Sequence, residues 1–275
     1  MYKTILVHVD LSAHAPARIH LAAVLARAHD ARLVGAAMLG ISRHVFPNGF
    51  DTAPGTLAAG VFDPLAENAR RALDQFERIA DAAGVRHASR FVADQADDGL
   101  ARLARFADLV VVSQDDPRES MPDMAVHLQE YVILNSARPV LMVPRGGAAR
   151  LDANALVAWN GSKEASAALA AAIPLLAGAP RVTVVALARA AEEAAFRDQA
   201  PDLLGFLRGH GVEADMLVRA PVRDGGHDLL AIAREFGCGL LVMGCFGRTR
   251  FQELCLGGAS RTILASAGIP VLLAH

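Results

Sequence analysis

The sequence predicts an α/β protein made of two tandem, doubly wound domains, each built on a five-stranded parallel sheet. Three observations carry this prediction. The 275-residue chain repeats itself, short apolar runs alternate with helical stretches in each repeat, and those runs are continuous rather than alternating. Continuous apolar strands are buried on both faces. Alternating strands and helices then indicate a parallel sheet covered by helices.

The repeat can be aligned at both ends of each half. Residues 5–12 correspond to residues 155–162, an offset of 150, and each segment is a strand-like run followed by an Asx-x-Ser turn. Residues 137–143 correspond to residues 268–274, an offset of 131. The two offsets, 150 and 131, differ by 19 residues. This difference predicts an insertion within the first repeat.

The insertion falls around residues 42–60, where Pro and Gly residues predict a long loop after the second strand. A surface loop and a lid over a binding site are both open interpretations of this stretch. The predicted domains are residues 1–146 and 151–275, and a short Gly-containing linker at residues 145–150 joins them.

Each repeat contains five predicted strands and four predicted helices in alternation. In the first repeat we expect strands near 4–9, 32–39, 86–92, 108–113 and 139–143, and helices near 14–29, 63–84, 97–106 and 123–137. In the second repeat we expect strands near 155–159, 181–187, 213–218, 239–243 and 269–273, and helices near 162–177, 190–210, 226–237 and 252–267. The polar side chains of the two Asx-x-Ser turns, residues 10–12 and 160–162, can cap the helices that follow them.

Composition and charge exclude several classes of protein. Hydrophobic residues make up 53% and charged residues 20%, which is typical of a folded globular chain and not of a disordered one. The net charge of −2 gives no basic surface for nucleic acid or for a membrane. No apolar run approaches the roughly 20 residues of a membrane span. Met1 leads directly into a strand-like run without a signal peptide core, so we expect a cytoplasmic protein.

The three cysteines, Cys238, Cys245 and Cys255, predict neither a disulfide framework nor a zinc site, because their number is odd and no CxxC motif surrounds them. Cys245 and Cys255 flank a Gly-containing loop, so a redox-sensitive pair and ordinary packing both stay open.

Polar residues of the first repeat are expected to gather at the carboxyl end of its sheet: His8, Asp10, Asp115 and Asp116. A site for a metal or a small cationic ligand is one interpretation of this group. A solvated acidic loop with a His at a strand end is the simpler one, and we predict no metal site.

The loop after the fourth strand of the second repeat carries the clearest sign of a binding site. Ligands of open parallel sheets bind beyond the carboxyl ends of the strands, at the switch point. Glycines in such a loop allow unusual φ/ψ angles and let a phosphate approach backbone N–H groups. The loop contains these residues of interest: Gly244, Gly247, Arg248, Gly257, Gly258 and Ser260. Neither a P-loop motif nor a GxGxxG after a first strand occurs, so neither of those nucleotide folds is indicated.

The Gly-x2-Gly-x9-Gly pattern, with the first strand and turn at residues 157–162 and the last strand at residues 269–272, resembles the universal stress protein family. The resemblance covers essentially the whole chain as two tandem repeats. It implies an adenine-nucleotide α-hydrolase-like fold that binds ATP across the carboxyl ends of the first, second and fourth strands. A Mg²⁺ ion would bind together with the ATP. In this sequence the implied nucleotide-binding residues are Ala158, Trp159, Asn160, Leu187, Gly244, Gly247, Arg248, Gly257, Gly258, Ala259 and Ser260.

Two positions depart from the family pattern. Asn160 stands where the family has an acidic residue, although its amide can still bond to a ribose hydroxyl. Gly258 stands where the family has Ser or Thr, so one phosphate-facing hydroxyl is lost. The loss of one such hydrogen bond costs about 0.5–1.5 kcal/mol, or up to roughly tenfold in affinity.

The first repeat has lost the phosphate-binding pattern. With the offset of 131, the glycines and Ser260 of the second repeat correspond to Ser113, Asp116, Val126, His127 and Gln129. Every glycine is replaced, and Asp115 and Asp116 place negative charge where a phosphate would bind. We therefore expect no ATP binding of the family's kind in the first repeat.

No catalytic motif such as GxSxG or HExxH occurs, and the resemblance implies at most slow ATP hydrolysis. We therefore predict a stress-response protein that binds a nucleotide through its second domain and signals to a protein partner. The alternative is a nucleotide-free scaffold. The resemblance implies that strands 139–143 and 269–273 pair two domains, so the repeats would form an intrachain pseudo-dimer, or the chain a homodimer. An α-hydrolase-class enzyme would need a Ser-Gly-Gly-x-Asp-Ser loop, which neither repeat has.

Overall fold

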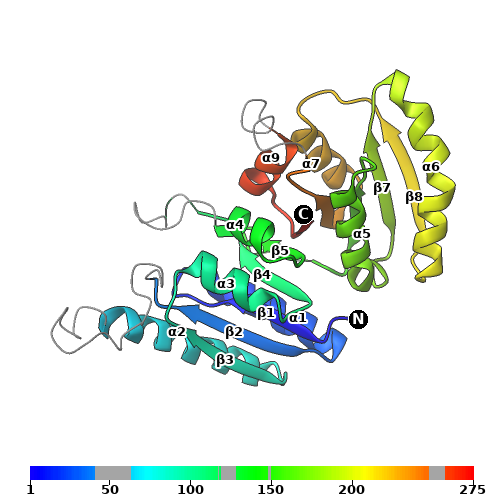
Figure 1. The fold of residues 1–275 in the computed structure, drawn as a ribbon. Helices are drawn as coiled ribbons and strands as arrows, with labels where there is room; N and C mark the ends of the chain where they lie inside the picture. Colours follow the sequence, from blue (N-terminus) through cyan, green and yellow to red (C-terminus); the bar gives the residue numbers. More distant parts are fainter. Residues whose placement is uncertain (41–62, 117, 119–127, 148–149, 248–257) are drawn as a thin grey trace. The chain divides into compact units, whose positions relative to one another are not determined.

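The computed structural model describes residues 1–40, 63–116, 118, 128–147, 150–247 and 258–275 (Figure 1). The chain divides into two compact units, Met1–Val140 and Leu141–His275. The predicted insertion around residues 42–60 falls almost entirely in the first gap and so lies outside the described residues.

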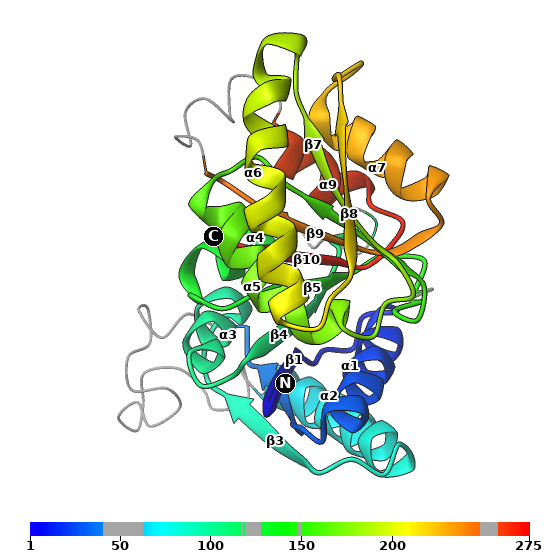
Figure 2. The same ribbon diagram turned by 90° about the vertical axis from the view of Figure 1, so that its right-hand side faces the viewer.

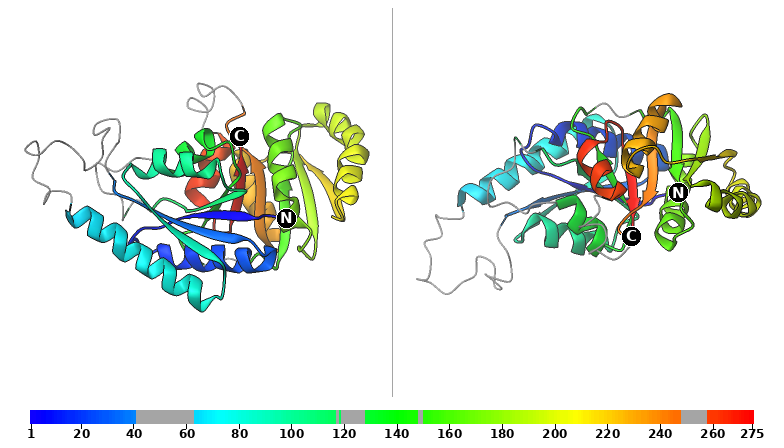
Figure 3. Two further views of the ribbon diagram at one scale, coloured as in Figure 1. Left: turned by 60° about the horizontal axis from the view of Figure 1, so that its bottom comes forward. Right: turned by 90° about the horizontal axis from the view of Figure 1, so that it is seen from above.

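The first unit is a parallel sheet with helices on both faces. Its strands are β1 (Thr4–His8), β2 (Arg32–Met38), β3 (His87–Val92) and β4 (Leu109–Ser113), in the order β3-β2-β1-β4. Its helices are α1 (Ala15–His29), α2 (Asp63–Ala82), α3 (Ala96–Ala104) and α4 (Leu128–Asn135). In the left view of Figure 3 the blue and cyan helices α1 and α2 lie on one side of these strands, and the green helices α3 and α4 lie on the other. β5 (Val140–Val143) begins at the last residue of this unit.

The second unit repeats this architecture. Its strands β6 (Asn154–Ala158), β7 (Val182–Leu187), β8 (Ala214–Arg219), β9 (Cys238–Gly244) and β10 (Val271–Ala274) are parallel, in the order β10-β9-β6-β7-β8. Its helices are α5 (Lys163–Leu176), α6 (Ala190–Gly209), α7 (Gly225–Glu235) and α9 (Ala259–Ser266). Figure 2 shows α6 running alongside β8. The predicted doubly wound α/β fold is confirmed.

The core of each unit follows from the apolar runs that predicted its strands. Ile5, Leu6 and Val7 of β1 are at most 2% exposed, as are Leu156 and Val157 of β6. Both faces of these strands are therefore covered, as continuous apolar runs require.

Gly35 gives the first unit one of its closest contacts between helix and sheet. A Cβ at this position of β2 would lie 2.6 Å from the ring of Phe76, which is fully buried in α2. The absence of a side chain at Gly35 thus makes the space that the aromatic ring fills.

The two Asx-x-Ser turns differ in how they begin their helices. Ser162 caps α5, because its Oγ accepts the N–H of Ala165 at 3.1 Å. Ser12 does not cap α1: the N-cap of that helix is His14, and no side chain caps it. The Ser12 hydroxyl instead donates to Asp10 Oδ1 at 2.6 Å. The prediction that these turns cap the following helices is therefore confirmed for residues 160–162 and wrong for residues 10–12.

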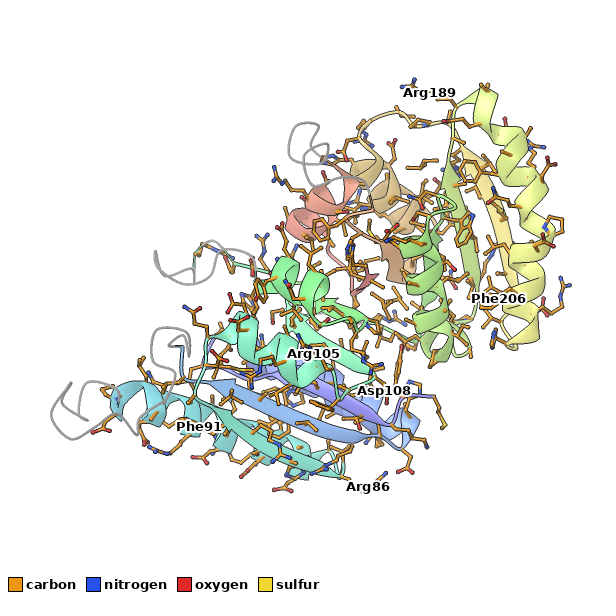
Figure 4. The ribbon with its side chains drawn as sticks, in the orientation of Figure 1. Arg86, Phe91, Arg105, Asp108, Arg189 and Phe206 are labelled. Carbon is orange, nitrogen blue, oxygen red and sulfur yellow. The ribbon has the colours of Figure 1, made fainter. Side chains whose placement is uncertain are left out.

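Polar side chains close the amino end of the sheet in the first unit. The Asp108 carboxylate, labelled in Figure 4, accepts the N–H groups of Lys3 and Thr4 at 2.7 and 2.9 Å, so it ties the start of β1 to the start of β4. Arg86, also labelled, donates to the carbonyl of Asp30 at the end of α1. Within the part of the chain that the structure describes, no helix is both long and apolar enough to cross a membrane.

Candidate functional site

The switch point of the second unit lies between β6 and β9. From β6 the chain moves to β7 and β8 on one side, and it returns to β9 and β10 on the other. Ala158, the last residue of β6, is level with Met243 of β9 and with Val185 of β7. The carboxyl ends of the three strands therefore meet at one edge of the sheet, where open α/β sheets bind ligands.

The turn after β6 carries two of the predicted residues at this edge, Trp159 and Asn160. The backbone N–H of Trp159 donates to Val185, and its indole Nε1 lies 3.4 Å from Oε1 of Gln199 in α6. Asn160 is exposed, and its Oδ1 accepts the N–H of Ser162 at 3.1 Å. Gly161 has a φ of 73°, which favours glycine at this turn. The Asn160 side chain thus shapes its own turn through Oδ1.

Close packing, and not an unusual backbone angle, accounts for glycine at positions 244 and 247. Neither has a positive φ; the residue in the left-handed region is Phe246, at 57°. A Cβ on Gly244 would lie 2.3 Å from the backbone N of Ala165, so this glycine lets β9 pack against the start of α5. The expectation that these two glycines supply unusual φ/ψ angles is therefore wrong.

The start of α9 completes the same edge. Gly258 is the N-cap of this helix, and no side chain caps it. The first N–H groups of a helix have no partner within the helix, so they attract anions. Ser260 is 4% exposed, and its Oγ accepts the N–H of Phe246 at 3.5 Å, which joins the glycine loop to the helix.

Leu187 and Ala259 also lie near one another. A Cβ on Gly225, the first residue of α7, would be 3.6 Å from a side-chain atom of each. The structure therefore gathers at one edge nearly all the residues that the sequence predicted. Arg248 and Gly257 lie outside the described residues.

Glu164 is a residue of this site that the sequence analysis missed. It is 3% exposed, and a Cβ on Gly247 would lie 2.5 Å from its Oε2. Burial raises the pKa of Glu164, but hydrogen bonds from its own backbone N–H and from the Ser162 hydroxyl, with the Lys163 charge, outweigh this effect and lower the pKa overall. An ionised carboxylate therefore lies against the glycine loop.

Arg18 fills the equivalent edge of the first unit. Its guanidinium is 1% exposed and donates to the carbonyl of His8 at 2.7 Å, to the Ser113 hydroxyl at 2.6 Å and to Asp10 Oδ1 at 3.0 Å. These acceptors belong to the ends of β1 and β4 and to the turn after β1. With the offset of 150, the corresponding residue of the second unit is Ala168. The signal in the sequence that could have indicated this buried guanidinium is an Arg among the apolar residues of an Ala-rich helix.

The Arg18 cation also sets the ionisation of its neighbours. The pKa of His8 is lowered to about 4, because burial and the Arg18 charge lower it more than the Asp10 charge raises it. Burial raises the pKa of Asp10, but the Arg18 charge and Ser12 hydrogen bonds hold it well below its usual range. His8 is therefore neutral and Asp10 ionised at neutral pH.

The prediction of a solvated acidic loop in the first unit is wrong. His8 is 7% exposed, and Asp10 pairs with Arg18. Asp116 is 9% exposed; it pairs with His14 at 3.1 Å and with Arg118, whose hydrogen bonds hold its pKa well below the usual range. The Arg18 guanidinium is thus the cation that this edge binds. No cluster of three metal-ligating side chains occurs among the residues searched, which are the described ones.

The other residues singled out in the sequence are the first-unit counterparts of the phosphate loop and the cysteines. Gln129 is buried in α4, whereas Val126 and His127 lie outside the described residues. Cys245 is 2% exposed, and its thiol lies 3.5 Å from the carbonyl of Ala274. Cys255 also lies outside the described residues, so both interpretations of the cysteine pair remain open.

Comparison with known proteins identifies the family. Residues 153–275, which span nearly all of the second unit, match the model of the universal stress protein family. The chain belongs to the universal stress protein family.

Solved structures of this family extend the comparison to the whole chain. A universal stress protein from Archaeoglobus fulgidus DSM 4304 is 15% identical with a TM-score of 0.72, covering 98% of this chain and 97% of that one. It therefore shares the fold of both units. A family member from Burkholderia pseudomallei is 30% identical over 52% of this chain and 96% of its own, with a TM-score of 0.38. A universal stress protein in complex with cAMP is 23% identical over 52% of this chain and 97% of its own, with a TM-score of 0.35. No curated protein matches the chain in sequence.

Proposed function

We propose that the second unit binds an adenine nucleotide at the carboxyl ends of β6, β7 and β9, and that the protein serves a stress response by binding and signalling. One observation carries this proposal: the strand register puts Ala158 beside Met243, so the Asn160 turn and the glycine loop both begin at the switch point. A site with backbone donors, an amide and an uncapped helix start suits a ribose and a phosphate.

The contrast between the two units supports the assignment to the second. In the first unit Arg18 fills the edge of the sheet from α1. In the second unit Ala168 takes that position, and its methyl group reaches no acceptor of the strand ends. At this position α5 therefore brings no guanidinium to the strand ends of the second unit.

Each residue has a defined part in the proposed complex. The Asn160 amide would donate to a ribose hydroxyl, and backbone groups of Ala158 and Trp159 would line the same side. Leu187 would pack against the base. The first N–H groups of α9, after Gly258, would bind phosphate oxygens, and a Mg²⁺ ion, when bound, would supply charge neutralisation to the phosphate chain.

The chemistry of the site favours binding over catalysis. Hydrolysis of a phosphoanhydride needs a water activated by a base or a metal. The Glu164 carboxylate lies at the glycine loop, but its lowered pKa makes it a weak base, and it already accepts hydrogen bonds within its own helix turn. We therefore expect turnover to be slow or absent.

Titration calorimetry with ATP, ADP and AMP tests the proposal. We expect about one site per chain. Gly247→Asp, which copies Asp116 of the first unit, should abolish binding, and the matched Asp116→Gly change should leave the affinity unchanged. Asn160→Asp keeps the oxygen that accepts the Ser162 N–H and removes the amide donor, so it should weaken binding by up to roughly tenfold.

Other outcomes would change the assignment. Absence of heat with all three nucleotides would overturn nucleotide binding and favour a scaffold that acts through protein contacts alone. Two sites per chain would show that the Arg18 guanidinium does not close the first unit.

A further inference from the structure

Glu164 lies at the nucleotide site proposed above, and the role assigned to it rests on that site. Glu164 is the second residue of α5, directly after the Ser162 cap and Lys163. Its carboxylate is fixed in place, because the Ser162 hydroxyl and its own backbone N–H both donate to it. Its side chain is 4% exposed, so little water surrounds the charge.

Gly247 is the residue of the glycine loop that lies against the Glu164 carboxylate. A Cβ there would lie 2.5 Å from Glu164 Oε2, so the carboxylate occupies the space that a side chain at Gly247 would take. The charge is therefore held against the loop that the phosphate chain would approach, and not on the far side of the helix.

The residues at the corresponding two positions of the first unit carry different charges. With offsets of 150 and 131, Glu164 corresponds to His14 and Gly247 to Asp116. His14 Nε2 lies 3.1 Å from Asp116 Oδ2, so the two positions are in contact in both units. In the first unit the contact joins a His to an acid. In the second, an acid faces a residue that has no side chain.

Among the described residues, the cation that pairs with Glu164 is Lys163, and it does not remove this charge. Lys163 Nζ lies 3.5 Å from Oε1, but the lysine side chain is 87% exposed. Ion pairs with such a solvated partner contribute little.

We propose that Glu164 sets the charge preference of the site, so that it discriminates against the multiply charged phosphate chain of ATP and favours adenine ligands with little negative charge at Gly247, namely a nucleoside or a monophosphate. Repulsion between a fixed carboxylate and a phosphate a few ångströms away weakens binding in proportion to the charge that approaches it. Adenosine carries none and escapes the penalty.

The test compares the affinities of adenosine, AMP and ATP for the wild-type protein and for Glu164→Gln, which keeps the shape of the side chain and removes its charge. We expect ATP to bind the variant about tenfold more tightly and adenosine to bind both proteins within about twofold. Glu213→Gln is the matched control, because it removes the same charge from an 81% exposed side chain of the same unit. It should change neither affinity.

Ionic strength gives a second test that needs no variant. Salt screens repulsion, so the wild-type affinity for ATP relative to adenosine should rise between low and high salt. A site dominated by attraction for phosphate would give the opposite trend.

The outcomes separate the two proposals. ATP binding that is tighter than adenosine binding in the wild type and unchanged in Glu164→Gln would overturn the role of Glu164 and leave the nucleotide site intact. An equal gain in Glu213→Gln would assign the effect to net charge and also overturn it. If no ligand binds either protein, both proposals fail.

Discussion

Replacing Arg18 with Met tests how the first unit is held together at the carboxyl end of its sheet. The variant keeps most of the apolar stem and removes the guanidinium. Three acceptors then lose a donor: the His8 carbonyl, the Ser113 hydroxyl and the Asp10 carboxylate. His8 and Arg18 are buried, whereas the Asp10 side chain is 35% exposed and can be hydrated.

The magnitude follows from these contacts. A buried polar group left without its partner costs about 1–3 kcal/mol, and breaking a fully buried ion pair costs about 3–5 kcal/mol. Because water reaches Asp10, we expect a loss of about 2–4 kcal/mol in the free energy of unfolding. The exposed Arg27 of the same helix is the matched control, and Arg27→Met should change stability by less than about 0.5 kcal/mol.

Urea denaturation with two probes measures the effect. Both tyrosines, Tyr2 and Tyr131, are in the first unit, and the single tryptophan, Trp159, is in the second. Tyrosine absorbance should therefore report the loss in Arg18→Met, and tryptophan fluorescence shows whether the loss stays within the first unit.

A double-variant cycle checks the physical cause. Arg18→Met should lower the free energy of unfolding less in an Asp10→Asn background than in the wild type, because the carboxylate that Arg18 neutralises is already gone. We expect a coupling energy of about 1–2 kcal/mol between the two changes. A loss below about 1 kcal/mol in Arg18→Met, or strictly additive effects in the cycle, would refute the reasoning.

Two further predictions concern pH and packing. The pKa of His8 is about 4 in the folded protein and about 6.5 in the unfolded chain, so between these values only the unfolded chain binds the proton. The free energy of unfolding should therefore fall by about 3 kcal/mol as the pH drops from 6.5 to 4. His8→Asn should remove this part of the pH dependence in urea midpoints and leave the smaller part due to His29, whose pKa is also lowered by burial; an unchanged profile would contradict the assignment. Gly244→Ala should destabilise the second unit by about 2–3 kcal/mol in tryptophan-monitored unfolding, since its Cβ would meet backbone at 2.3 Å. The control Gly146→Ala has nothing within 4 Å of its Cβ and should be neutral, so equal effects would count against the close-approach explanation.

Much of the candidate site could be predicted because it depends on chain order. Parallel strands put their carboxyl ends at one edge, so the turn at Asn160 and the loop at Gly244 had to meet once the strands were identified. The repeat offsets likewise aligned Asp116 with Gly247 before any contact was known.

The sequence led to the wrong physical reason in two places. The glycines suggested freedom of φ, yet Gly244 is required by the close approach of α5, a distance that no local pattern contains. The acids of the first repeat suggested a hydrated loop, because nothing in their spacing indicates that Arg18 reaches Asp10 from the next helix or that His14 reaches Asp116 over a separation of 102 residues.

The sequence by itself determined the two repeats, the order and identity of their strands and helices, and the edge of the sheet where a ligand would bind. Those features depend on the period of apolar residues and on the direction of parallel strands, which are properties of the local chain. Only the tertiary structure decided which charges meet at that edge: Arg18 inside the first unit, and Glu164 against Gly247 in the second. Such contacts join residues that are distant in sequence, and their burial gives each charge an effect that composition cannot reveal.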